Sequence, residues 1–326
     1  MKTHRPSFLA HRVTLTAAVA VGLVGFSASV SAQGKKKNPV SKVFVADVNG
    51  EATIDTGDSI EDLSKRAVYS AQGTVIETKK PEAAADRSKY FSTMVYSNGT
   101  GAFFDADTHV EVKQFVQEPF TPSRTDMDTE PSLSQTQAFV AHGSVGLCVS
   151  KLVAGSAMNY QTPHGSVSIR GQKVVIDANK DVTKISMIEG ESTVRAGAMD
   201  MGGHILHAGE QAIIRSSGVG EPNSIQITKI PDNEAGQLDE KVTMACMAKR
   251  TVYFEVREKK GESNEQFGTG AEATEGGTRG AVTAFDGDKD SGGTPTQEIV
   301  PVIVVPTNLP TDYTMSASRA EKTPGG

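Results

Sequence analysis

The sequence predicts an all-β protein, a two-sheet sandwich or a solenoid-like β wrap of short strands, followed by one helix and a disordered tail. Between residues 41 and 217, short apolar runs alternate with polar residues and end at Gly, Asn or Pro, which is typical of strands joined by turns. Residues 233–250 contain good helix formers. Residues 258–326 contain few large apolar residues, so they cannot bury enough surface to offset chain entropy.

Two Asn-Gly dipeptides predict hairpins, because both residues readily adopt the positive φ of a tight turn. Asn49-Gly50 would join strands at 43–48 and 52–54, and Asn98-Gly99 would join strands at 93–97 and 102–104. Three prolines in 119–136 predict a long surface loop. Further strands are expected at 138–141, 145–149, 157–161, 167–170, 173–176, 183–188, 192–195, 204–207 and 211–215.

The expected helix at 233–250 is amphipathic, with Leu238, Val242, Ala245 and Met247 on roughly one face, and a final strand is expected at 251–256. The predicted organisation is a signal peptide at 1–32, a flexible lead at 33–40 and the β domain at 41–217. A C-terminal extension at 218–257 and the low-complexity tail at 258–326 follow.

The N-terminus predicts export. Three basic residues precede an apolar run at 14–24, and Val30-Ser31-Ala32 supplies the small residues that a signal peptidase requires, so cleavage is expected between Ala32 and Gln33. An uncleaved anchor would need about 20 predominantly apolar residues. We therefore expect a periplasmic or secreted protein that meets the membrane only through its signal sequence before cleavage.

The charge balance argues against nucleic acid as a partner. Three of the 33 basic residues and none of the 39 acidic residues lie in the leader, so the mature chain would carry a net charge near −9. Its one basic cluster, Lys35-Lys36-Lys37, is best interpreted as a solvated terminus.

The two cysteines, Cys148 and Cys246, would enter an oxidising compartment, where a disulfide could form. Such a bridge would stabilise the fold by about 4 kcal/mol in the chain-entropy model. Two separate buried thiols are the alternative.

No motif predicts catalysis, a cofactor or a metal. His204 and His207 would point to opposite faces of a strand, and His109, His142 and His164 are scattered. The acidic repeat Asp286, Asp288, Asp290 lacks the Gly and Glu of a helical calcium loop. Gly143-Ser144-Val145-Gly146 lacks the spacing of a nucleophile elbow. We expect a protein that is not an enzyme.

Four segments, in order, resemble the FecR domain, the extracytoplasmic part of bacterial envelope regulators that relay receptor occupancy to sigma factors. They are MVYSNGTGAFFDADTHVEVKQF (94–115), TPHGSVSIRG (162–171), MIEGESTV (187–194) and LHAGEQAII (206–214), and the region covers about a third of the chain. Their Gly and Pro residues are turn formers between strands. Gln172, Lys173 and Val174 replace the threonine and aromatic residue usual in the family, and only residues 1–12 precede the apolar run, so we expect no cytoplasmic sigma-binding region.

The resemblance implies a protein-interaction module of the bacterial envelope, with a role in envelope signalling. Its partner would be a receptor, another envelope protein or a second copy of the chain. The alternative is a protein that binds envelope or surface polysaccharide, with Tyr90, Tyr96 and Tyr160 as candidate platforms on a chain that has no tryptophan. A third hypothesis is a hydrolase that uses carboxylates such as Glu111 and Glu189 as an acid and base pair.

Overall fold

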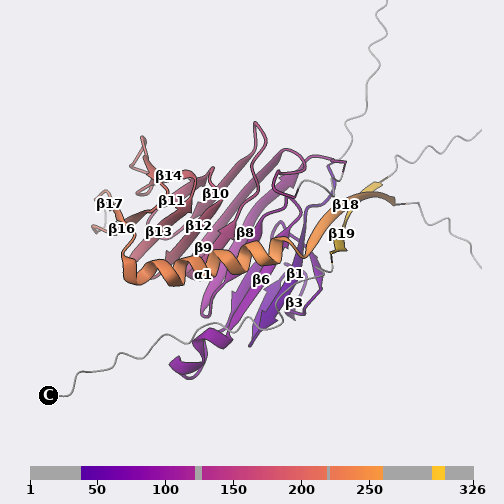
Figure 1. Ribbon diagram of the computed structural model, residues 1–326, viewed down its shortest axis with the longest axis horizontal. Coiled ribbons are helices and arrows are strands. Elements are labelled where there is room, and N and C mark those ends of the chain that lie inside the picture. The colour runs from indigo at the N-terminus through magenta and orange to yellow at the C-terminus, as the bar shows by residue number, and fades with distance from the viewer. Residues whose placement is uncertain (1–37, 122–126, 219–220, 260–295, 305–326) are drawn as a thin grey trace, which may run out of the picture. The chain divides into compact units, whose positions relative to one another are not determined.

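Two β-sheets lie face to face and share their longest strand, β9 (Ser134–Cys148) (Figure 1). This is the arrangement in a computed structural model that describes residues 38–121, 127–218, 221–259 and 296–304. The all-β prediction is confirmed, since the described residues contain one α-helix and are otherwise dominated by strands. The leader, with Ala32 and Gln33, and most of the tail lie outside the described residues.

The registers divide the strands into sheets A and B. Sheet A runs β17 (Ser224–Lys229), β16 (Glu210–Arg215), β13 (Val182–Glu189), β12 (Lys173–Ala178), β9, β7 (Gly101–Phe104), β6 (Phe91–Tyr96), β1 (Lys42–Asn49), β4 (Val68–Ser70). Sheet B runs β15 (His204–His207), β14 (Glu191–Arg195), β11 (Ser166–Ile169), β10 (Ala157–Gln161), β9, β8 (Thr108–Gln117), β5 (Val75–Thr78), β2 (Ala52–Asp55), β3 (Ile60–Asp62). The named pairs are antiparallel except β9 with β10.

Strand β9 changes sheets at Gly143. Residues up to His142 pair with β8 or β10 in sheet B, and residues from Gly143 onward pair with β12 in sheet A. Gly143 has a φ of 96°, and a Cβ there would collide with the backbone of Thr108. The sequence predicts two separate strands here, at 138–141 and 145–149, but glycine lets one strand bend between the sheets.

The main core fills the space between the inner faces of the two sheets. The strands alternate, so every second side chain points inward. Large side chains with almost no exposed surface come from both sheets, namely Phe104, Met94, Leu147, Ile176, Ile185 and Met187 from sheet A and Ile54, Ile76, Met158, Ile169 and Leu206 from sheet B.

Helix α1 (Asp232–Lys249) covers the outer face of sheet A, where it crosses β6, β7, β9 and β12 (Figure 1). Its buried face carries Leu238, Val242 and Ala245, as expected, but Ala248 and not Met247 completes it. Lys241 Nζ lies 3.1 Å from Asp105 Oδ2 and 2.6 Å from Ser144 Oγ, which adds polar anchors to the apolar contact.

A disulfide joins α1 to the sheet beneath it. Cys148, the last residue of β9, is bonded to Cys246 on the helix, and their Cα atoms are 5.1 Å apart. Both cysteines pack with Phe91, Phe103 and Ala245 in a small apolar cluster. The helix is therefore held by covalent, polar and apolar contacts.

A second, two-stranded sheet follows α1 and corrects the expected tail. Strand β18 (Val252–Lys259) pairs with β19 (Thr296–Ile303), which lies inside the region assigned to a disordered tail. Ile299 is buried in a cluster with Phe254 and Phe44. The low average apolar content of the predicted tail concealed this short β-branched segment, which forms a strand because it gains a core contact.

Of the two predicted hairpins, one is confirmed and one is wrong. Strands β6 and β7 pair directly around Asn98-Gly99. Around Asn49-Gly50, however, β1 pairs with β4 and β6 in sheet A, whereas β2 pairs with β3 and β5 in sheet B. The turn has the expected positive φ at Gly50. It nevertheless carries the chain from sheet A to sheet B, and β1 and β2 each bury one face in the core between the sheets.

Among the described residues, no helix is long and apolar enough to cross a membrane.

Close packing of α1 depends on glycines in the sheet. A Cβ at Gly101 would collide with the carbonyl oxygen of Ala245, and one at Gly146 would lie 2.9 Å from that of Lys241. We expect Gly101→Ala to lower the free energy of unfolding by about 2 kcal/mol in urea titrations, because helix backbone must move. Gly236 lies on α1 itself and has open space around it. Gly236→Ala should therefore raise the free energy of unfolding by about 0.5–1 kcal/mol. Equal stability of the two variants would contradict this packing.

The disulfide closes a loop between residues 98 positions apart. Cys246→Ser should therefore lower the free energy of unfolding by about 4 kcal/mol under oxidising conditions, since the unfolded chain regains the entropy that the bridge removed. Under strong reduction the wild type and the variant should converge. A persistent difference after complete reduction would show that the lost stability came from packing at Cys246 instead.

Candidate functional site

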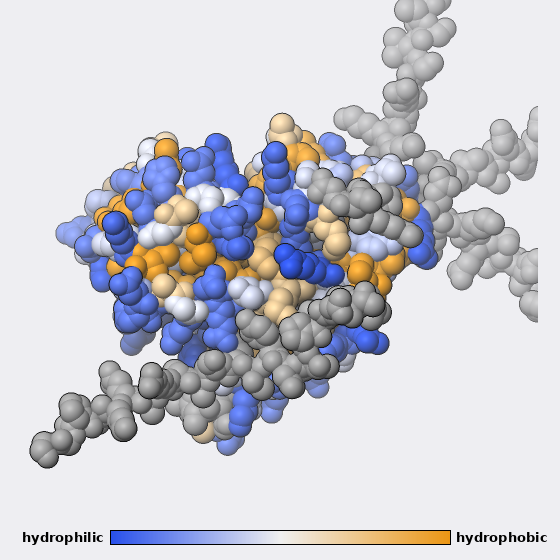
Figure 2. Space-filling view, viewed as in Figure 1, coloured by the Kyte–Doolittle hydropathy of each residue, from blue (hydrophilic) through white to orange (hydrophobic). Residues whose placement is uncertain are grey.

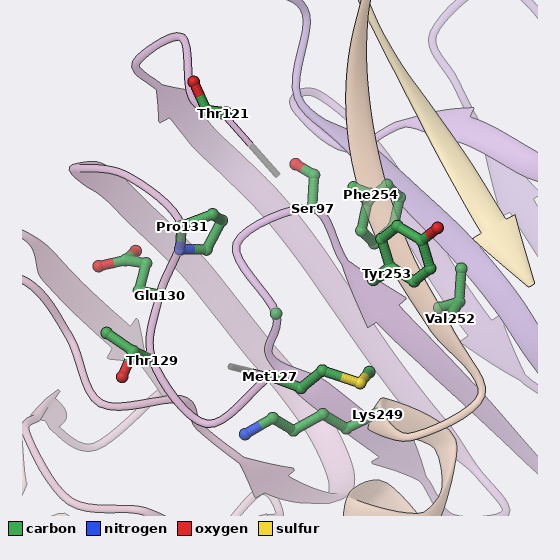
Figure 3. A pocket seen from close by; sticks show the side chains of 11 residues that line it. Ser97, Thr121, Met127, Thr129, Glu130, Pro131, Lys249, Val252, Tyr253 and Phe254 are labelled. Atoms are coloured by element: carbon green, nitrogen blue, oxygen red, sulfur yellow. The ribbon is translucent and has the colours of Figure 1, made fainter. Parts of the chain in front are cut away.

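One pocket of about 190 Å³ opens between the β6–β7 turn, the loop at 127–131 and the start of β18 (Figure 3). Ser97 and Gly99 line it from the turn, and Val252 and Phe254 line it from β18. The loop that contributes Glu130 was expected to be a surface loop, but Glu130 is only 3% exposed.

The carboxylate of Glu130 accepts hydrogen bonds from two other segments of the chain. Ser134 Oγ donates to one oxygen, and the backbone N–H of Val153 donates to the other at 3.1 Å. Asn98 Nδ2 donates to Ser134 Oγ at 3.2 Å, which links this network to the β6–β7 turn. The network fastens the loop to both sheets.

Burial raises the pKa of Glu130 above its usual value, because desolvation disfavours the charged form, and hydrogen bonds from Ser134, Ser156, Val153 and Asn98 offset part of this rise. On another wall, Lys249 is almost buried and its Nζ lies 3.6 Å from Asp128 Oδ1. The acid and the amine thus each have partners within the fold, and we assign the pocket a structural role.

The histidines that the structure describes fall into three environments. His164 is buried, with Nδ1 3.1 Å from Thr183 Oγ1 and Nε2 3.2 Å from the Lys180 carbonyl. His204 and His207 are exposed on β15. His109 and His142 stack across β8 and β9 with ring centroids 5.7 Å apart. Sequence reasoning missed this pair because it required the β8–β9 register. Across the described parts of the chain, no three His, Cys, Asp or Glu side chains form a metal-binding group.

The candidate platforms and the candidate acid–base pair are not assembled into sites. Tyr96 and Tyr160 are buried in the core, which raises the pKa of both phenols by desolvation. Tyr90 is partly buried, and a Cβ at Gly50 would lie 2.6 Å from its ring. Glu111 and Glu189 lie on different sheets, on β8 and β13.

Exposed apolar side chains lie on β15 and on the segment before it, at the edge of sheet B. We call the group formed by Met199, Met201 and Ile205 the end surface. Met199, Met201 and Ile205 are 65%, 84% and 60% exposed. Figure 2 shows hydrophobic residues at the surface in this part of the molecule, near the places of β14 and β17 in Figure 1. Sequence reasoning missed this surface because Met199 and Met201 lie between expected strands.

No family model and no curated protein matches the chain. Two solved structures, each described as a "putative anti-sigma factor" from Parabacteroides distasonis ATCC 8503, are similar to half of it. Their TM-scores are 0.35 and 0.34, at 13% and 14% identity, and the chain spans 62% of the length of each. We draw nothing about function from similarity at this level.

The raised pKa of Glu130 predicts a pH dependence of stability. A carboxyl whose pKa is higher in the folded state favours folding below its unfolded pKa, and this advantage is lost as the pH rises through the folded pKa. The stability of the wild type relative to Glu130→Gln should therefore fall as the pH rises from the ordinary carboxyl pKa of 4.5 through the raised pKa of the folded state. Chemical unfolding at several pH values measures it, with exposed Glu118→Gln as the control. A relative stability that rises over the same range would contradict the assignment.

Proposed function

We propose that this chain is an exported, non-enzymatic, FecR-like protein-interaction module of the bacterial cell envelope, with a role in envelope signalling. The end surface is the observation that carries the proposal. Strand β15 is the edge strand of sheet B there, and an edge strand presents backbone groups to which another chain can add a strand. Exposed methionines beside such an edge suit a protein partner, because their flexible side chains adapt to different surfaces.

Two further observations support the proposal. The Cys148–Cys246 disulfide fits export, since such bonds persist in oxidising compartments. The glycines of the FecR-like segments also lie at turns, with Gly165 between β10 and β11, Gly190 between β13 and β14, and Gly209 between β15 and β16. Gly190 and Gly209 have φ values of 95° and 81°, which favour glycine.

Charges placed on the end surface test the proposal. Met201→Lys with Ile205→Lys should abolish capture of the envelope partner, or self-association in sedimentation velocity, because burying two unpaired ammonium groups is costly. Ile60→Lys is the matched control, since Ile60 is 72% exposed on β3, the opposite edge of sheet B. The control should bind like the wild type.

Two results would overturn the proposal. One is a wild-type protein that remains monomeric and retains no envelope protein at physiological salt. The other is a double variant that folds and binds as well as the wild type does.

A further inference from the structure

A polar groove of about 410 Å³ lies on the outer face of sheet B, across β9, β10, β11 and β14. Its lining combines amides, hydroxyls and two guanidinium groups, and contains no carboxylate. The lining residues are Gln137, Asn159, Gln161, Ser166, Ser168, Arg170, Thr193 and Arg195. This volume is within the range of about 300–1,000 Å³ that is usual for small-molecule sites.

Strand alternation arranges these side chains as a grid. Inward positions of the same strands hold core residues such as Met158, Val167 and Val194, so the residues between them point outward. The register then aligns them across strands. Gln137, Asn159, Ser168 and Thr193 are successive cross-strand partners, and Gln161, Ser166 and Arg195 form the next row.

Within the described fold, these polar groups are not used in hydrogen bonds, although the charge of Arg195 helps to lower the pKa of Asp200. In the part of the chain that the structure describes, none of the eight side chains forms a hydrogen bond with another residue, although hydrogen bonds are abundant among the neighbouring buried polar groups. Asparagine and glutamine each offer donors and an acceptor, and a hydroxyl offers both. The groove therefore presents an ordered array of unused donors and acceptors on a rigid sheet.

The charges indicate an anionic ligand with more than one acidic group. Arg170 lies four residues beyond Ser166 on the same chain segment, and Ser166 is the cross-strand partner of Arg195. The two arginine Cα atoms are thus about 13 Å apart along the strand direction. That spacing suits successive acidic groups on one chain better than a single phosphate. A second hollow of about 450 Å³ shares Gln161, Ser166 and Arg195 with the groove, and that hollow is also lined by the carboxylate of Asp200.

We propose that this groove binds an acidic oligosaccharide whose repeating units carry carboxylates, such as a hexuronate. Arg170 and Arg195 would pair with carboxylates, and the amides and hydroxyls would bind sugar hydroxyls. Single-stranded nucleic acid fits less well, because it is usually bound by aromatic platforms, and no aromatic side chain lines the groove. This inference is independent of the proposed function, since it rests on a different surface.

Titration of the full chain with tetragalacturonate tests the inference, with neutral maltotetraose and a short oligothymidylate as comparison ligands. We expect tetragalacturonate to bind, with affinity that falls as salt is added, and maltotetraose to bind at least tenfold more weakly. Arg170→Gln with Arg195→Gln should weaken binding about tenfold or more, because charged hydrogen bonds are lost. Lys80→Gln with Arg250→Gln removes the same charge from exposed positions outside the groove and should change nothing.

Side-chain amide resonances provide a second readout that needs no variant. On addition of tetragalacturonate, the NH₂ signals of Gln137, Asn159 and Gln161 should shift. Three results would overturn the inference: no binding of tetragalacturonate, binding that survives the double arginine substitution, or oligothymidylate binding with equal affinity and equal dependence on the two arginines.

Discussion

The bend of β9 at Gly143 is the constraint on which the rest of the fold depends. Because one strand belongs to both sheets, the inner faces are held in one register and close a single core. The same strand ends at Cys148, which bonds to α1, and carries Gly146, which lets the helix lie close to the sheet. Any other residue at position 143 would have to adopt a positive φ, and its Cβ would collide with Thr108.

The two outer faces have different roles. The outer face of sheet A is covered by α1, whose apolar side chains pack on Phe91, Phe103 and Val175 and whose backbone lies close to two glycines of the sheet. Over four strands of sheet B, the outer face instead carries polar side chains that form no hydrogen bonds with other residues of the described fold. Covering one face stabilises the sandwich, while the other face and the exposed edges remain accessible to ligands and partners.

The sequence predicted local structure better than long-range pairing. The β6–β7 hairpin and the helix were predictable because turn chemistry and helix propensity act over a few residues. The pairing around Asn49-Gly50 was not predictable, since the dipeptide specifies a positive φ but not which sheet the next strand joins. The polar groove could not be predicted either, because it depends on long-range pairing. Its strands were expected, but only their register brings Asn159, Ser168 and Thr193 into one row.

The central claim is that β9 unites both sheets into one cooperative structure, and native-state hydrogen exchange tests it most directly. The account predicts that amides on both sides of Gly143 exchange only through global unfolding, with the same free energy of opening. If residues 134–142 exchange through a separate opening of lower free energy than residues 144–148, the sheets are independent units and the account is contradicted.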